Sequence, residues 1–162
     1  IALRKDYSEA HNYLGAIYMD MGQWEKAIDS FDNALKNYLY ATPALALYNS
    51  GWAYYNLEKY DMALSRYRQA LQQDRTGVLR AQIEKNMGLV YVKQSNLIEA
   101  KKHFEKSVEL NPSLYDAQFF LAETYLKIRD TGNAKKSFQQ VIKLAPQSPF
   151  AQKAREYLQS LR

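Results

Sequence analysis

Side chains able to carry chemistry are sparse in this chain. His11 and His103 are its only histidines, they lie far apart, and neither has a second ligand at metal-binding spacing, so both are expected on exposed helical positions. Asp116 and Glu123 lie about two turns apart on one predicted helix, too far for shared acid–base work. Cysteine is absent and the six glycines are scattered, which excludes disulfides, thiolate chemistry and a phosphate-binding loop. The sequence therefore predicts a protein that is not an enzyme, with no metal site and no cofactor.

The net charge of +5 raises the question of nucleic acid, because a basic stripe is the usual footprint of phosphate binding. The pairs Lys101–Lys102 and Lys135–Lys136 are instead interleaved with Glu99, Glu105 and Glu109, as on a solvated outer helix face. We therefore expect no nucleic-acid partner, although the charge suits weak attraction to an acidic protein. No run of about 18 apolar residues occurs, so no transmembrane segment is expected.

The elements that carry these residues follow from a phrase that recurs four times. Small residues open the copies at intervals of 36, 37 and 34 residues: Gly15, Gly51, Gly88 and Ala122. A tyrosine follows three positions later in every copy, and small, aromatic and small residues then recur at helical spacing, as in Ala27, Phe31 and Ala34. Small residues let two helix backbones approach, and the aromatic covers the gap beside them. The phrase predicts stacked helix–turn–helix units.

This phrase, at a period near 34 residues, resembles the tetratricopeptide repeat. The resemblance implies an all-α, right-handed superhelical solenoid of antiparallel helix pairs, whose first helices line a concave groove. First helices are predicted over residues 8–21, 43–56, 80–93 and 114–128, and second helices begin near Trp24, Tyr60, Leu97 and Thr131. The repeats accordingly span residues 8–42, 43–79, 80–113 and 114–147.

The two ends and two of the joints depart from this period. Residues 1–7 are similar to the end of a preceding repeat's second helix, and a signal peptide or lipid anchor would lie upstream of them. Residues 148–162 are predicted to form a capping helix, with Ser148 as its N-cap and Pro149 at its first position. Extra residues near 37–43 and 74–78 should bulge at the joints or extend the neighbouring helices.

The predicted binding groove is the face that the first helices turn away from their own pair. Aromatic rings and amides on that face suit an extended or helical partner segment. We expect Trp52 to contribute most, while the alternative is that rings such as Tyr13, Phe120, Trp52, Tyr48 and Tyr55 fill the space between helices. The predicted groove residues are Asn12, Tyr13, Tyr48, Asn49, Trp52, Tyr55, Asn56, Lys85, Asn86, Leu89, Phe119, Phe120 and Glu123.

The tetratricopeptide resemblance implies binding of a protein or peptide. Members that clamp a C-terminal carboxylate use lysine, arginine and asparagine from three successive first helices. Asn49 and Asn86 match that set in kind, but Asn12 and Ala16 stand where the first copy would need a lysine and an asparagine. A carboxylate clamp is therefore not implied.

A narrower resemblance is to the pilotins of type IV pilus assembly, of the PilF, PilW and Tgl type. It rests on residues 84–90 and 100–107 and on the lengthened approach after Asp74. It implies a secretin subunit as partner and a lipoprotein on the periplasmic face of the outer membrane. Two alternatives remain open: a generic cytoplasmic scaffold, and the regulatory part of a larger enzyme.

Overall fold

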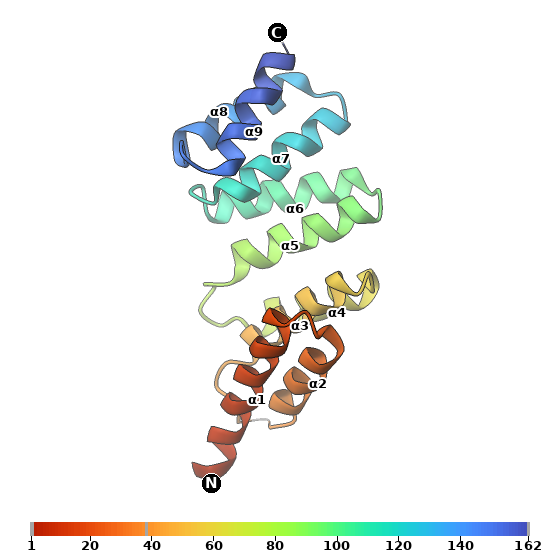
Figure 1. Ribbon diagram of the computed structural model, residues 1–162, viewed down its shortest axis with the longest axis vertical. Coiled ribbons are helices and arrows are strands. Elements are labelled where there is room, and N and C mark those ends of the chain that lie inside the picture. The colour runs from red at the N-terminus through yellow and green to blue at the C-terminus, as the bar shows by residue number, and fades with distance from the viewer. Residues whose placement is uncertain (1, 38, 162) are drawn as a thin grey trace. The chain divides into compact units, whose positions relative to one another are not determined.

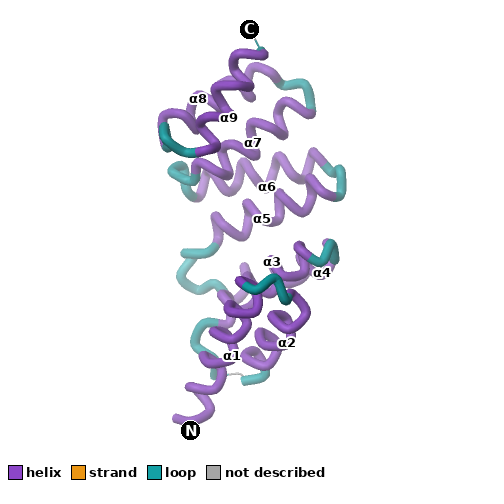
Figure 2. Tube along the Cα trace, viewed as in Figure 1, coloured by secondary structure: helices purple, strands orange, loops and turns teal. Residues whose placement is uncertain are grey.

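The computed structural model describes residues 2–37 and 39–161, and within them the chain forms helices and no strands (Figures 1 and 2). The second helices begin at Trp24, Tyr60, Leu97 and Thr131 as predicted, and the all-α class is confirmed. The helices are α1 (Ala2–Asp20), α2 (Trp24–Leu35), α3 (Pro43–Asn56), α4 (Tyr60–Gln73), α5 (Arg80–Lys93), α6 (Leu97–Leu110), α7 (Tyr115–Lys127), α8 (Thr131–Leu144) and α9 (Pro149–Ser160).

The chain divides into two compact units, Ile1–Ile83 (unit 1) and Glu84–Arg162 (unit 2). In unit 1, α1 packs on α2, α2 on α3 and α3 on α4. In unit 2, α6 packs on α7, α7 on α8, and α9 on both α8 and α7. Short turns join the two helices of each pair, so the partners run antiparallel, and α9 closes unit 2 as the predicted capping helix.

A glycine lying under an aromatic ring brings the two helices of a pair together. The rings of Phe31, Tyr67 and Phe104 are fully buried on the second helices of three pairs. A Cβ atom added to the glycine opposite would lie 2.5 Å from Cε1 of Phe31 at Gly15 and 2.6 Å from Cε1 of Phe104 at Gly88. Any side chain at these glycines would collide with the ring, because a buried ring has no room to move.

The four hairpin turns have the same backbone conformation. Each contains a residue with positive φ at the same place in the repeat: Gly22 (69°), Glu58 (59°), Ser95 (59°) and Arg129 (64°). In the first turn, the Gln23 amide donates to the Tyr18 carbonyl at 2.8 Å and the Gly22 amide donates to the Met19 carbonyl at 2.9 Å. This pair of bonds is the Schellman motif, which satisfies carbonyls at a helix end, and it recurs in all four turns.

The two lengthened joints do not extend the neighbouring helices, since α2 ends at Leu35 before α3 begins at Pro43, and α4 ends at Gln73 before α5 begins at Arg80. The second joint is held by Asp74, whose side chain is buried. Its Oδ1 accepts hydrogen bonds from the Thr76 hydroxyl and the Gly77 amide, both at 2.9 Å, and its Oδ2 accepts from the Leu79 amide at 3.0 Å. Burial alone raises the pKa of this carboxyl, but the hydrogen bonds outweigh it and hold the pKa below its ordinary value.

The amino-terminal prediction needs correction. Residues 2–7 are not the end of a separate helix, because α1 runs without a break from Ala2 to Asp20, and Ile1 lies outside the described residues. No proline or glycine stands before Gly15 to interrupt it. At the other end, Ser148 caps α9 as predicted by accepting a hydrogen bond from the Ala151 amide at 3.1 Å, with Pro149 at the first helical position.

We predict that Gly88→Ala destabilises the protein by about 1–3 kcal/mol through overpacking against Phe104. The change is measured as the free energy of unfolding in urea. The matched control is Gly132→Ala on the exposed surface of α8, where an added Cβ meets no atom closer than 3.9 Å. Equal stability of Gly88→Ala and the wild type would show that the ring can move aside.

The folded-state pKa of Asp74 lies below its unfolded value, so its carboxylate contributes stability that is fully present above about pH 4 and is lost as the pH falls through the folded-state pKa. Asp74→Asn should cost about 1–3 kcal/mol at pH 7, because the amide NH2 cannot accept from the Leu79 amide. The cost should shrink when unfolding is measured at pH 2.5. Asp29→Asn, at an exposed position of α2, serves as the control. A pH-independent cost would contradict the assignment.

Candidate partner-binding surface

Unit 1 carries an aromatic shelf formed by Trp52 and Tyr55 on α3 and by Tyr60 at the start of α4. The rings of Trp52 and Tyr55 stack with centroids 5.0 Å apart and planes 14° apart, and Tyr60 lies 6.0 Å from Tyr55. All three side chains are half-buried. Burial, and then the neighbouring Tyr60, raise the pKa of Tyr55, so its phenol stays a neutral hydrogen-bond donor. The shelf therefore combines apolar area with polar tips.

The other predicted groove residues of unit 1 differ in their burial and in the direction of their side chains. Asn56 lies at its end and donates from its side-chain amide to the Trp52 carbonyl at 2.8 Å, while Asn49 is half-buried on the same helix. Tyr48 turns toward the pair's interior, with its ring 6.1 Å from Tyr67. On α1, Tyr13 is 67% exposed, whereas Asn12 is buried and its Oδ1 has no hydrogen-bond partner among the described residues.

In unit 2 the predicted groove residues are engaged by the chain itself. Lys85 on α5 forms an ion pair with Asp116 on α7, with Nζ 2.7 Å from Oδ2. Glu123 accepts a hydrogen bond from the Tyr157 hydroxyl of α9 at 3.0 Å. Burial and this bond raise the pKa of Tyr157. Asn86 is buried, and Leu89 packs on the core between α6 and α7.

The placement of Phe119 corrects the sequence-based expectation for unit 2. Its side chain is 2% exposed and lies in the core beside Phe138, Phe150 and Tyr157, so it lines no accessible groove. The reason is α9, whose Phe150 and Tyr157 cover the side of α7 that the repeat pattern leaves open. Phe120 is half-buried and packs against the same helix through Phe150.

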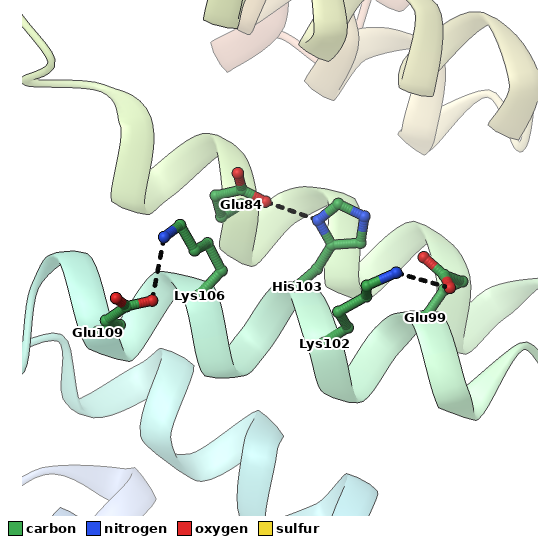
Figure 3. Close-up of polar contacts among 6 residues, drawn as sticks. All are labelled: Glu84, Glu99, Lys102, His103, Lys106 and Glu109. Carbon is green, nitrogen blue, oxygen red and sulfur yellow. Dashed lines mark hydrogen bonds and ion pairs between the residues drawn. The ribbon is translucent and has the colours of Figure 1, made fainter.

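The outer face of α6 also departs from expectation at one residue. His103 is not exposed: its Nδ1 lies 2.6 Å from Glu84 Oε2 on α5 (Figure 3). Its ring also stacks on Tyr91. The neighbouring charges behave as predicted for a solvated face, since Lys102 pairs with Glu99 at 3.4 Å and Lys106 with Glu109 at 3.0 Å (Figure 3).

A cleft of about 600 Å³ in unit 1 was not predicted from the sequence. It lies where the two lengthened joints come together, with Leu39, Leu45 and Val78 among its apolar residues and Asp74 in its wall. The two departures from the repeat period were the only signal for it.

Family models of the tetratricopeptide repeat match residues 6–76, 86–114 and 115–148. This chain belongs to the tetratricopeptide-repeat family. It is similar to the human intraflagellar transport protein 88 homolog, with 26% identity over 144 residues, which are 88% of this chain and 17% of that protein. It is also similar to the TPR repeat-containing protein MJ1428 of Methanocaldococcus jannaschii, with 32% identity over 107 residues, which are 65% of this chain and 17% of that protein.

Solved structures show the same tetratricopeptide fold. Pseudomonas aeruginosa pilF has a TM-score of 0.79 and 23% identity, and the likeness covers 95% of this chain and 72% of that one. YrrB, described as a TPR protein with an unusual peptide-binding site, has a TM-score of 0.67 and 24% identity, with 84% of this chain and 68% of that one covered. At 23% and 24% identity, these likenesses show the fold alone.

The tetratricopeptide register shows why the shelf is confined to one repeat. Trp52 directly follows the small residue of its copy, and the counterparts of Trp52 are Ala16, Leu89 and Glu123.

Among the residues that the structure describes, no three His, Cys, Asp or Glu side chains gather as a metal site would require. Within the same residues, no helix is both long and apolar enough to cross a bilayer.

We predict that Lys85 and Asp116 are coupled by about 1 kcal/mol, because both side chains are mostly buried and their contact is short. A double-mutant cycle with Lys85→Met and Asp116→Asn measures this coupling from urea unfolding. The exposed pair Lys106 and Glu109 is the control, and its cycle should give under about 0.5 kcal/mol. Equal couplings in the two cycles would contradict the prediction.

Proposed function

We propose that this tetratricopeptide-repeat chain is an adaptor that binds a segment of a partner protein on the aromatic shelf of unit 1. The observation that carries the proposal is the stacked, half-buried pair of Trp52 and Tyr55. Aromatic side chains that are apolar on their faces and polar at their tips are typical of protein interfaces. In unit 2, by contrast, Lys85, Phe119 and Glu123 already have partners within the chain.

The chemistry of the shelf suits an extended segment with an apolar or proline side chain. Such a side chain would lie on the face of Trp52, where aromatic contact contributes most per residue. Asn49 supplies an amide next to it, and Asn56 retains its side-chain carbonyl oxygen as an acceptor for a backbone amide. The structurally similar YrrB is itself a TPR protein with a peptide-binding site, which supports this kind of ligand.

For the biological setting we propose type IV pilus biogenesis, with the chain acting as a pilotin that assists assembly or outer-membrane localisation of a secretin subunit. Support comes from the resemblance of residues 84–90 and 100–107 to pilotins and from the fold shared with pilF. In that setting the protein would lie on the periplasmic side of the outer membrane and carry an upstream lipid anchor. A cytoplasmic scaffold or the regulatory part of a larger enzyme would use the same shelf on a different partner.

The test uses overlapping 15-residue peptides that cover the type IV pilus secretin subunit of the source organism. A Trp24→Phe background leaves Trp52 as the only tryptophan, so its fluorescence reports occupancy of the shelf. One segment should bind and shift this emission. Calorimetry then compares the wild type with Trp52→Ala, made without the Trp24→Phe change. Trp52→Ala should weaken peptide binding at least tenfold, a loss of about 1.4 kcal/mol in binding free energy.

The control variant is Met62→Ala, which truncates an exposed apolar side chain of α4 in the same unit. It should leave affinity unchanged. A randomised peptide library supplies the second probe. If library peptides bind in a way that requires Trp52 while no secretin segment binds, the proposed adaptor function is supported and the pilotin role is overturned. Binding that survives Trp52→Ala, or unfolding of that variant by circular dichroism, would overturn the shelf itself.

A further inference from the structure

The excess positive charge of the protein lies in and around helix α8 of unit 2. Residues 127–155 contain seven lysines and arginines and one acidic residue, Asp130, whereas the rest of the chain contains fifteen basic and sixteen acidic residues. The Asp130 carboxylate is itself engaged, since it accepts hydrogen bonds from the backbone and side-chain amides of Asn133 at 3.1 and 2.8 Å. The net charge of +5 is therefore concentrated in this part of the chain.

The exposed surface of α8 has lysines and no acidic side chain. Lys136, Gln139 and Lys143 are exposed and lie on one side of the helix, because their spacings of three, four and seven residues are those of a helix face. Lys135 lies half-buried beside them. Within the described residues, none of the three lysines forms an ion pair. These four residues are called the basic face below.

The other second helices have a different charge pattern at the positions that correspond to Lys136, Gln139 and Lys143. Those positions are Asp29, Asp32 and Lys36 in the second copy of the pattern around α2, Ser65, Arg68 and Gln72 on α4, and Lys102, Glu105 and Glu109 on α6. On α6 the charges are paired, as Lys102 is with Glu99 at 3.4 Å (Figure 3). The expectation of a face neutralised by glutamates therefore holds for α6 and not for α8.

The start of α8 departs from the other second helices in the same direction. An acidic residue complements the positive end of the helix dipole in the first turn of α2, α4 and α6: Glu25, Asp61 and Glu99. The first turn of α8 has none, and Lys135 and Lys136 follow directly after it. Neither the dipole nor an ion pair gives these two lysines a stabilising role. Residues that depart from such local rules without an internal compensation are typical of functional surfaces.

We propose that the basic face of α8 binds an extended acidic segment of a partner protein. Lys136 and Lys143 are separated by about 10 Å along the helix axis, which is also the length of three residues of extended chain. Two carboxylates three residues apart can therefore meet both ammonium groups. Gln139 lies between the two lysines, where its amide can exchange hydrogen bonds with the backbone of the segment. The partner segment accordingly carries Asp or Glu at every third position.

Two other anionic partners fit the basic face less well. A phosphate group only accepts hydrogen bonds and would use one half of the Gln139 amide, whereas a peptide backbone uses both halves. Nucleic-acid readers commonly use arginine and aromatic rings, and the basic face contains neither. Anionic lipid surfaces are bound by clusters of about four to eight cations, more than the three lysines of α8. The observations therefore favour an acidic protein segment.

The probe is a twelve-residue synthetic peptide of repeating Glu-Gly-Ser, which places a carboxylate at every third position. Titrated into the full isotope-labelled chain at low salt, it should shift amide resonances of residues 131–144. Lys136→Gln combined with Lys143→Gln should raise the Kd, measured by fluorescence anisotropy, by about fivefold or more. The same peptide with Gln in place of Glu should not bind.

The matched control is Lys102→Gln combined with Lys106→Gln on the outer face of α6, where both lysines already pair with glutamates. This variant removes the same net charge and should leave the Kd within about twofold of the wild type. Thermal melts establish that both double variants remain folded. Because the basic face shares no residue with the aromatic shelf, Trp52→Ala should leave the Kd of the acidic peptide unchanged, so this proposal does not rest on the proposed function.

Peptide shifts that avoid residues 131–144, or equal weakening by the two double variants, would overturn the proposal by showing attraction to net charge alone. A DNA duplex of twelve base pairs and vesicles containing phosphatidylglycerol are the competing probes. If either binds more tightly than the peptide, and Lys136→Gln with Lys143→Gln abolishes that binding, the basic face belongs to nucleic acid or to lipid and the proposal is overturned.

Discussion

The contact between a glycine backbone and an aromatic ring determines how closely the two helices of a pair approach each other. Gly15, Gly51 and Gly88 bring backbone against Phe31, Tyr67 and Phe104 at distances that no Cβ would permit. The spacing between the two helices of each pair follows from that approach. The fourth pair uses Ala122 opposite Phe138, both fully buried, so the rule admits a methyl group where the ring has room. The side chains that we propose to bind a partner therefore lie on helices whose spacing is set by contacts inside each pair.

Much of this fold could be predicted, because periodicity and small-residue placement are local in sequence. The second helices start at the predicted residues, and Ser148 and Pro149 open α9 as N-cap chemistry requires. The left-handed residues Glu58 and Arg129 could not be predicted, since neither type favours positive φ and the Schellman bonds impose it. The pairing of His103 with Glu84 was likewise invisible, because it joins two helices whose relative rotation only packing fixes.

The site shows the same division. The repeat pattern predicts which side chains point away from the core of their own helix pair, but it does not predict which other elements of the chain cover those side chains. Phe119 has the same register as Lys85, and it is nevertheless buried because α9 brings Phe150 and Tyr157 against it. In unit 1, Trp52 and Tyr55 stack on each other and are half-buried. The contribution of Trp52 to binding stays a prediction, and the identity of its partner depends on chemistry outside this chain.

Helix contacts within each unit join neighbours, or at most a helix and the next but one, as in α7 with α9. Low separation along the chain lowers the loop-closure entropy of each step, so assembly can start at any hairpin and spread outward. Such a polymer-like folding scheme makes stability modular. Substitutions on the outer surface of one hairpin can then accumulate, because folding can still start from the neighbouring hairpins.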